Sequence, residues 1–173
     1  MTILKIPCGM ESQDADDLRE QLGASSQYFF SRKFPDAVYK LETPSKVEKK
    51  ISTYLEKAKD HAATILNTTS DRLSLENLFL AVYTKLEKPG PSKPAPPNIA
   101  IVILALGKLN QNNKLQLFQA LSDKSLESFQ LESGDMLAAR SNTPQWFEGK
   151  GGGLAHISIW VRMDATPPVT IEE

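Results

Sequence analysis

The sequence predicts a single α+β domain, an α/β sandwich in which amphipathic helices pack on an antiparallel β-sheet. Three observations support this fold class. In the first half of the chain, apolar residues recur at three- and four-residue spacing, which is typical of helices with one buried face. From residue 99 onward they alternate or run continuously, as in strands. The strands follow one another closely, and short connections favour antiparallel pairing because parallel strands need long crossovers.

The composition is that of an ordinary folded protein, and it narrows the classes of partner. The 173 residues are 40% hydrophobic and 24% charged, and a chain of this length can form a core without disulfides or metal. The net charge of −1 lacks the basic excess of a dedicated nucleic-acid binder, so we expect no nucleic-acid partner. Cys8 is the single cysteine, which excludes an intramolecular disulfide, and we interpret it as a small buried hydrophobe.

Prolines divide the chain into two halves of one folded domain. Residues 89–97 include five prolines, which exclude a helix or a central strand, so we interpret this segment as an extended linker. Residues 1–88 form the mainly helical half, and residues 98–163 form the strand half. Residues 164–173 contain two adjacent prolines and are expected to form a loose tail.

The first half begins with three short or medium elements. Residues 2–6 predict a short strand. Residues 14–30 predict a helix whose first turn is acidic, which suits the positive end of the helix dipole. Prolines bracket residues 38–42, which we interpret as a second short strand.

Two amphipathic helices are predicted next, over residues 46–67 and 73–88. Ser45 and Glu48 have the spacing of a capping box, in which the two side chains satisfy backbone N–H groups at the start of the helix. Each segment has one apolar stripe, so each helix is expected to bury one face. The stripe residues are Val47, Ile51, Tyr54, Leu55, Ala58, Ala62, Ile65 and Leu66 in the first helix, and Leu75, Leu78, Phe79, Val82, Tyr83 and Leu86 in the second.

The second half predicts five strands. Residues 99–106 are apolar on both faces, which indicates a central strand that is covered on both sides. Residues 115–121, 126–131 and 136–140 follow, with short polar segments between them. Residues 154–163 alternate most clearly, with one wholly apolar face. The opposite face of this last strand carries Leu154, His156, Ser158, Trp160 and Arg162.

The residues that could carry chemistry form no catalytic or metal-binding motif. His61, His156 and Cys8 show no spacing typical of zinc or non-haem iron ligands, so we predict no metal site. We find no nucleophile or cofactor motif either, and the sequence therefore predicts no catalytic residue, no cofactor and no enzyme. A deep pocket around His156, Ser158 and Arg162 would instead indicate an enzyme, whereas a helix packed over that face would exclude a site there.

A glycine-rich segment, residues 148–153, stands beside two large aromatic residues. It precedes a strand and lacks the sequence of a phosphate-binding loop, so we interpret it as a flexible loop. Exposed aromatic residues beside such a loop are candidates for contact with a membrane interface or a partner. The candidate contact residues are Trp146, Phe147, Lys150, His156 and Trp160.

No segment of the sequence predicts insertion into a membrane as a helix. The N-terminal apolar run is too short for a signal peptide, and residues 99–106, the longest apolar run, are less than half of a membrane-spanning helix. We therefore expect a soluble protein made in the cytoplasm, which can be released and associate with a membrane later.

Residues 2–6, 75–86 and 114–121 are predicted as strand, helix and strand, and they fix the order of elements along most of the chain. This order resembles that of Cyt-type cytolysins, the CytB-like insecticidal delta-endotoxins and volvatoxin-like fungal proteins. Residues 34–46 provide less strand than such a cytolysin has. The resemblance implies an α/β/α sandwich that binds a lipid membrane, moves its helices off the sheet and oligomerises into pores.

The alternative is a non-enzymatic, self-associating structural protein, such as a viral matrix- or coat-like component, or a partner-binding module. Near-neutral charge, a stiff proline-rich linker and a loose tail suit assembly. Both hypotheses predict self-association. Only the first predicts a lipid membrane as partner, so lipid-dependent pore formation distinguishes them.

Overall fold

Two antiparallel sheets and two long helices form the part of the chain that the computed structural model describes, which is residues 3–31, 38–42, 45–83, 97–107, 115–122, 125–141, 143, 145–149 and 153–163. The helices are α1 (Ser12–Ser31) and α2 (Ser45–Leu66), and a short 3₁₀ helix follows at Ser70–Arg72. The strands are β1 (Ile3–Ile6), β2 (Val38–Glu42), β3 (Leu73–Tyr83), β4 (Ile99–Ala105), β5 (Leu115–Ser122), β6 (Ser125–Phe129), β7 (Met136–Arg140), β8 (Gln145–Gly149) and β9 (Gly153–Arg162).

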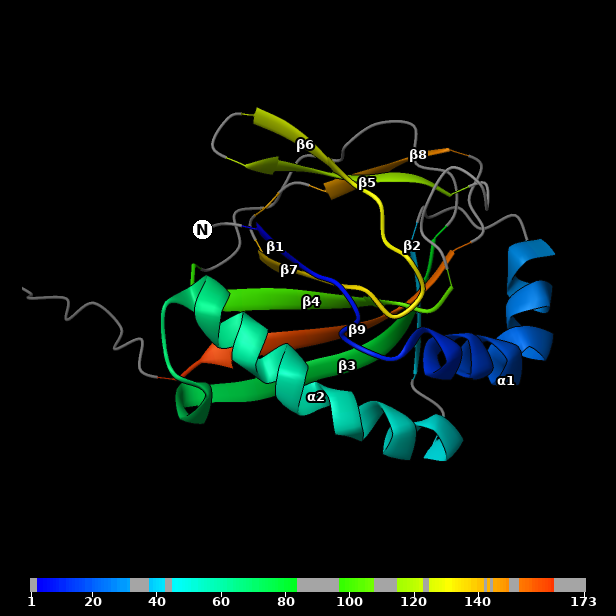
Figure 1. The fold of residues 1–173 in the computed structure, drawn as a ribbon, viewed down its shortest axis with the longest axis horizontal. Coiled ribbons are helices and arrows are strands. Elements are labelled where there is room, and N and C mark those ends of the chain that lie inside the picture. Colours follow the sequence, from blue (N-terminus) through cyan, green and yellow to red (C-terminus); the bar gives the residue numbers. More distant parts are fainter. Residues whose placement is uncertain are drawn as a thin grey trace, which may run out of the picture.

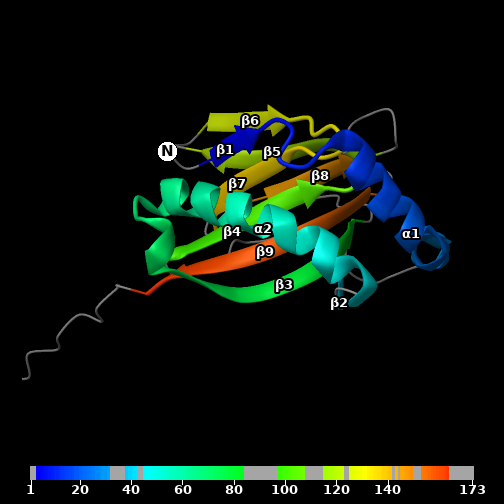
Figure 2. The ribbon, with the colours of Figure 1, turned by 60° about the horizontal axis from the view of Figure 1, so that its bottom comes forward.

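The elements are arranged in three layers. The larger sheet has six strands in the order β1-β7-β4-β9-β3-β2, and the smaller sheet has three in the order β6-β5-β8. The smaller sheet lies over one face of the larger sheet, and α2 runs across the opposite face (Figure 1 and Figure 2). We call the face toward α2 the outer face of the six-stranded sheet, and the face toward the smaller sheet its inner face.

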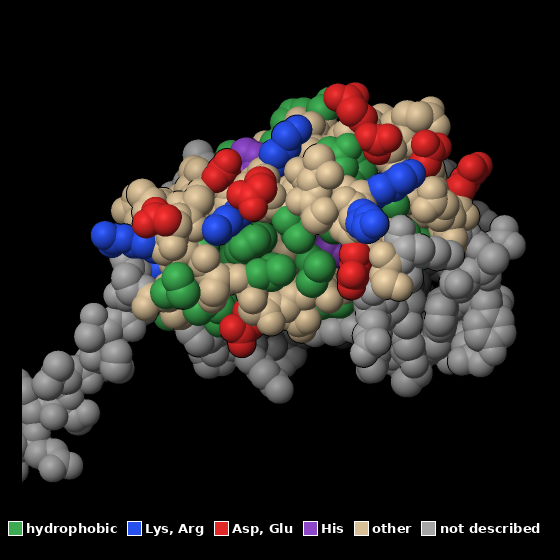
Figure 3. Space-filling view, turned by 90° about the horizontal axis from the view of Figure 1, so that it is seen from below, with side chains coloured by type: hydrophobic (Ala, Val, Ile, Leu, Met, Phe, Trp, Pro, Cys, Tyr) green, Lys and Arg blue, Asp and Glu red, His purple; other side chains and the backbone are tan. Residues whose placement is uncertain are grey.

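The outer face and α2 share one hydrophobic core. The predicted stripe of α2 is confirmed: Val47, Ile51 and Ile65 are buried against the sheet. They pack with alternate residues of the central strands, such as Val102 and Leu104 of β4. The solvent side of α2 carries charges of both signs (Figure 3). Amphipathic packing thus orients the helix as its sequence predicts.

The inner face carries a second apolar core made of the other set of alternating residues. Phe129 of β6 packs against this core, so the smaller sheet covers it. Because β4 and β7 bury both faces, their sequences are apolar almost throughout. β9 also buries both faces, but its outer face carries the buried polar residues His156 and Ser158. The buried residues of the inner face are Phe79, Ala81, Ile103, Ala105, Leu131, Leu137, Ala155 and Ile157.

The predicted helix over residues 73–88 is wrong, because residues 73–83 form strand β3 between β9 and β2. The register of β3 against β9 shifts between Leu75 and Asn77. Leu75 lies opposite Trp160 and Leu78 lies opposite Ser158, so both leucines lie on the outer face although they are three residues apart. A β-bulge therefore produces the three-residue spacing that is otherwise typical of a helix.

The remaining predicted elements are confirmed to within two residues at each end. The prediction of one antiparallel sheet is confirmed only in part. The residues of β8 were predicted only as aromatic residues beside the glycine-rich loop, but they form a strand that completes a second sheet with β5 and β6. Five residues are too few to show a clear alternation. Most of the predicted linker, residues 150–152 of the glycine-rich loop and the predicted tail lie outside the described residues. Within the described residues, no helix has the length and apolarity that crossing a bilayer requires.

Candidate functional site

His156 lies on β9 beneath α2, on the outer face of the six-stranded sheet. It is 3% exposed, and burial lowers its pKa to about 4. The hollow beside it, between α2 and the sheet, measures about 10 Å³, which is no more than one water requires. Because α2 covers this face, the described residues leave beside His156 a hollow too small for an organic substrate.

Of the other predicted contact residues, only Trp160 has a side chain within the described part of the chain. Trp160 is 4% exposed, and its indole Nε1 donates a hydrogen bond of 2.9 Å to Ser158 Oγ, so it belongs to the helix-side core. Trp146 and Phe147 lie on β8, whose side chains are outside the description, and so is Lys150. 

The prediction that Cys8 is buried is wrong, because its side chain is exposed. Cys8 lies in a turn with a φ of 52°, and its backbone N–H donates to Asp135 Oδ1 at 3.0 Å. The backbone of this turn is held by Asp135, so the thiol is left facing solvent. Residue type alone could not show this turn.

Alanines form one row across the inner face. Ala155 of β9 is paired in register with Ala81 of β3 on one side and with Ala105 of β4 on the other. All three are fully buried. The next row of the same face carries large side chains, including Phe79, Ile157 and Ile103. The side chains of the inner face therefore protrude least from the sheet along the alanine row. We call these three residues the alanine floor.

A polar rim adjoins the β4 end of the alanine floor. Ala105 N donates to Asp135 O at 2.9 Å, which places the turn after residue 131 beside the floor. In that turn, Ser133 Oγ donates to Asp16 Oδ1 of α1 at 2.6 Å and accepts from Gly107 N at 3.0 Å. These bonds tie α1 to the turn before β7, and that turn to the end of β4. 

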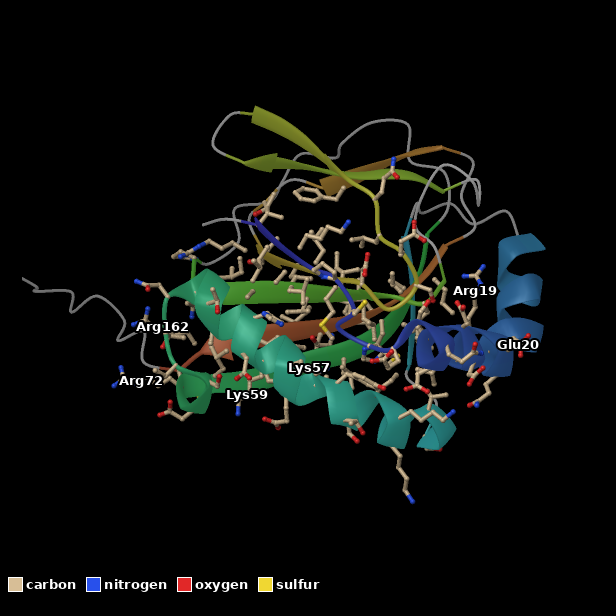
Figure 4. The ribbon with its side chains drawn as sticks, viewed as in Figure 1. Arg19, Glu20, Lys57, Lys59, Arg72 and Arg162 are labelled. Carbon is tan, nitrogen blue, oxygen red and sulfur yellow. The ribbon has the colours of Figure 1, made fainter. Side chains whose placement is uncertain are left out.

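Arg19 of α1 completes the rim (Figure 4). Its Nη1 donates to Leu106 O at 2.9 Å. Burial lowers the pKa of Arg19, and the nearby Asp16 carboxylate opposes that shift. Gly107 has a φ of +89°, and a Cβ there would lie 2.8 Å from Arg19 Cδ, so only glycine allows the guanidinium to lie across this turn. Asp16, Arg19, Ser133 and Asp135 together form what we call the polar rim.

By sequence, the chain matches no protein-family model and no curated protein. By structure, one match is HygX from Streptomyces hygroscopicus with nickel, 2-oxoglutarate and hygromycin B bound, with a TM-score of 0.64 at 12% identity over 95% of this chain and 84% of that one. This chain has the fold of that protein. A Pseudomonas putida prolyl-4-hydroxylase gives 0.63 at 8% identity, over 93% and 92% of the two chains. SnoK, a non-haem α-ketoglutarate-dependent carbocyclase of nogalamycin biosynthesis, gives 0.62 at 10% identity, over 93% and 79%.

These matches overturn the predicted resemblance to Cyt-type cytolysins. The resemblance required a helix at residues 75–86, where the structure has strand β3. The predicted pore-forming toxin is therefore wrong, and so is the alternative of a self-associating structural protein or partner-binding module. The expectation of a protein that is not an enzyme is also corrected, because the matching structures are enzymes. Element order alone could not distinguish these folds.

The residues of this chain do not fit the iron centre that the fold implies. Non-haem Fe(II) oxygenases hold the metal with two histidines and one carboxylate. The chain has two histidines, of which His61 lies on α2 and His156 lies beneath that helix, both on the outer side of the sheet. Among the described residues, no three His, Cys, Asp or Glu side chains are grouped as metal ligands. The inner face instead carries the apolar core and the alanine floor.

Proposed function

We propose that the chain binds a small, largely apolar organic molecule between its two sheets and acts on it without an iron ion held by histidines. The alanine floor is the observation that supports this proposal. Ala81, Ala155 and Ala105 lie in register on three neighbouring strands and carry smaller side chains than the next row of the inner face. Such an arrangement suits a ligand whose apolar surface contacts the sheet.

The physical basis is an apolar floor with a few polar groups at one end, which is the usual composition of a small-molecule site. Apolar contact with the floor supplies affinity, at about 25 cal/mol for each Å² removed from water. The rim residues Arg19, Asp16 and Ser133 are fixed by hydrogen bonds and can orient a polar end of the ligand. In this proposal, the alanine floor binds the ligand and the polar rim orients it.

Structural neighbours support an organic ligand. HygX is seen with hygromycin B bound, and SnoN, with a TM-score of 0.54 at 9% identity, is seen in complex with nogalamycin RO. Both proteins hold an organic molecule within this fold. The identity is too low to carry over the ligand, so the size and polarity of the site decide what this chain binds.

The first test is binding of N-phenyl-1-naphthylamine, an uncharged apolar dye whose fluorescence increases when it moves from water into an apolar environment. We expect the wild-type protein to bind it, and Ala155→Phe to weaken binding at least about tenfold because the ring would occupy the volume that the proposed ligand needs. Leu75→Ala is the matched control, since Leu75 is an exposed apolar residue of the outer face. It should leave dye binding unchanged.

Equal dye binding by the wild type and Ala155→Phe would contradict the site. If Ala155→Phe does not fold, Ala81→Val adds less volume on the same row and keeps the measurement possible. If the site above the alanine floor is unfilled, we expect the melting temperature of Ala81→Val to be close to that of the wild type. Overpacking of a filled core would instead cost about 1–3 kcal/mol.

A second test concerns the metal. We expect tag-free protein to bind neither Ni(II) nor 2-oxoglutarate in calorimetric titrations, and to form no succinate from 2-oxoglutarate with Fe(II), because the inner face of the described strands has no histidine. Binding of both ligands by the wild type, lost in His156→Gln, would overturn the iron-free part of the proposal. Dye binding and metal binding are separate readouts, so one part can fail without the other.

A further inference from the structure

Two arginines and an asparagine form a row on the outer face of the six-stranded sheet, at the end opposite to the polar rim. Arg140 ends β7 and Arg162 ends β9, and β4 lies between these strands. Arg140 is paired with Ala100 of β4, while Arg162 N donates to the carbonyl of Asn98, just before β4. The alternation that places Ala138 and Trp160 in the helix-side core also places both arginines on the outer face.

This row borders a hollow of about 290 Å³, lined by Pro97, Asn98, Arg140 and Arg162. The hollow lies beyond the C-terminal end of α2, because Arg162 Nη1 approaches Leu66 O at 3.4 Å. Figure 4 shows Arg162 at the same end of the sheet as Arg72, far from Arg19. The hollow is thus separate from the alanine floor and from the polar rim.

The guanidinium of Arg140 is positioned and still has donors to offer. Its Nη1 donates to Pro97 O at 2.8 Å, which holds the side chain at the wall of the hollow. A guanidinium has five N–H donors in a fixed planar fork, and this contact uses one nitrogen. Arg140 and Arg162 are both half-buried, so their charges are less screened than those of exposed side chains.

We propose that this hollow binds a small oxyanion, a phosphate or carboxylate group of a small molecule. β7 and β9 are two strands apart, about 10 Å, so two long side chains can converge on one anion or on two groups of one molecule. Guanidinium pairs with phosphate and carboxylate in bidentate geometry, and the Asn98 amide can add a donor. The volume is near the lower end of about 300 Å³ for ligand sites, which suits a small anion.

The charges that line the hollow favour an anion. Arg72 is adjacent, since Arg72 O accepts from Met163 N next to Arg162. Asp71, its exposed neighbour, has a pKa lowered by a side-chain hydrogen bond with Thr69 and, to a lesser extent, by Arg72 and Lys59. Asp71 does not line the hollow. The lining side chains that carry charge are therefore both positive within the described part of the chain.

The test is calorimetric titration of the full chain with inorganic pyrophosphate and, separately, with citrate, at about 0.15 M salt. We expect a dissociation constant below about 1 mM for one of them, and the stronger of the two identifies the anion as phosphoryl or carboxylate. Arg140→Gln should weaken binding at least about tenfold, because it removes charge-assisted hydrogen bonds. Arg140→Lys should be intermediate, since it keeps the charge but loses the fork.

Arg72→Gln is the matched control, because it removes one positive charge from the same end without touching the hollow. It should change affinity by less than about twofold. Equal losses in Arg72→Gln and Arg140→Gln would show attraction to net charge only and overturn the proposal, as would no binding of either probe by the wild type. Thermal melts accompany each variant, and Arg140→Lys replaces Arg140→Gln if the latter does not fold.

Discussion

His156 is an ionisable group placed where its charged form is disfavoured. Burial beneath α2 lowers its pKa to about 4, whereas an unfolded chain keeps the ordinary value near 6.5. The folded protein therefore holds His156 neutral over a range in which the unfolded chain binds a proton. This difference makes stability depend on pH.

We predict that the free energy of unfolding falls by about 3 kcal/mol from this residue alone as the pH drops from above 6.5 to below 4. The sign follows because the unfolded state binds the additional proton, so acid favours unfolding. Urea denaturation at pH 7 and near pH 4.5 measures the change, compared with that of His156→Gln. The variant should lose less stability on acidification than the wild type; an identical loss would show that His156 has the same pKa in the folded and unfolded states.

His61 provides a comparison with His156, because burial lowers the pKa of both residues. It lies on α2, and burial lowers its pKa against the opposing effect of Asp60, but it is only half-buried. His61→Gln should therefore alter the pH dependence less than His156→Gln does. The sequence could place both histidines on their elements, but it could not show which one the helix would cover.

Among the elements, α2 is the one whose sequence and structure agree most closely. Its capping-box sequence and apolar stripe predict residues 46–67, and the helix spans Ser45–Leu66. β3 shows the opposite case, since leucine and glutamate favour a helix locally while pairing with β9 and β2 imposes a strand. Tertiary pairing overrides local preference there because β3 is hydrogen-bonded to a neighbouring strand on each side.

We predict that Ile51→Ala, which truncates a side chain in the contact between α2 and the sheet, costs about 2–5 kcal/mol of unfolding free energy. Leu75→Ala is the control, because Leu75 is 41% exposed and leaves a smaller cavity. Its cost should be clearly lower, and urea denaturation measures both. Equal costs for the two variants would mean that α2 does not stabilise the sheet through this contact.

At the scale of the whole molecule, the sequence predicts which strands are apolar on one or both faces. It does not predict how those strands assemble into layers. Alternation identifies β9 and the two-sided apolarity of β4, because these patterns are local. The smaller sheet depends on pairing of β5 with β8, in which Phe118 and Phe147 are register partners, and no local pattern reveals such a distant partner. A three-layer arrangement therefore had to come from the structure.

The candidate site is hidden in the sequence for the same reason. Ala81, Ala105 and Ala155 are ordinary small residues in separate strands, and only their register brings them into one row. Arg140 and Arg162 likewise become neighbours only through β4. A motif search finds residues that are close in sequence, whereas both of these sites are made by strand pairing.

The position of β9 between β3 and β4 also constrains how the molecule can be made. β9 follows every other described strand in the sequence, yet it is a central strand that pairs on both sides. Until residues 153–162 have been synthesised, β3 and β4 each lack a neighbour and expose an unsatisfied backbone edge. The nascent chain must therefore wait for β9 to complete its main sheet, and until then it is most prone to aggregation and most accessible to chaperones.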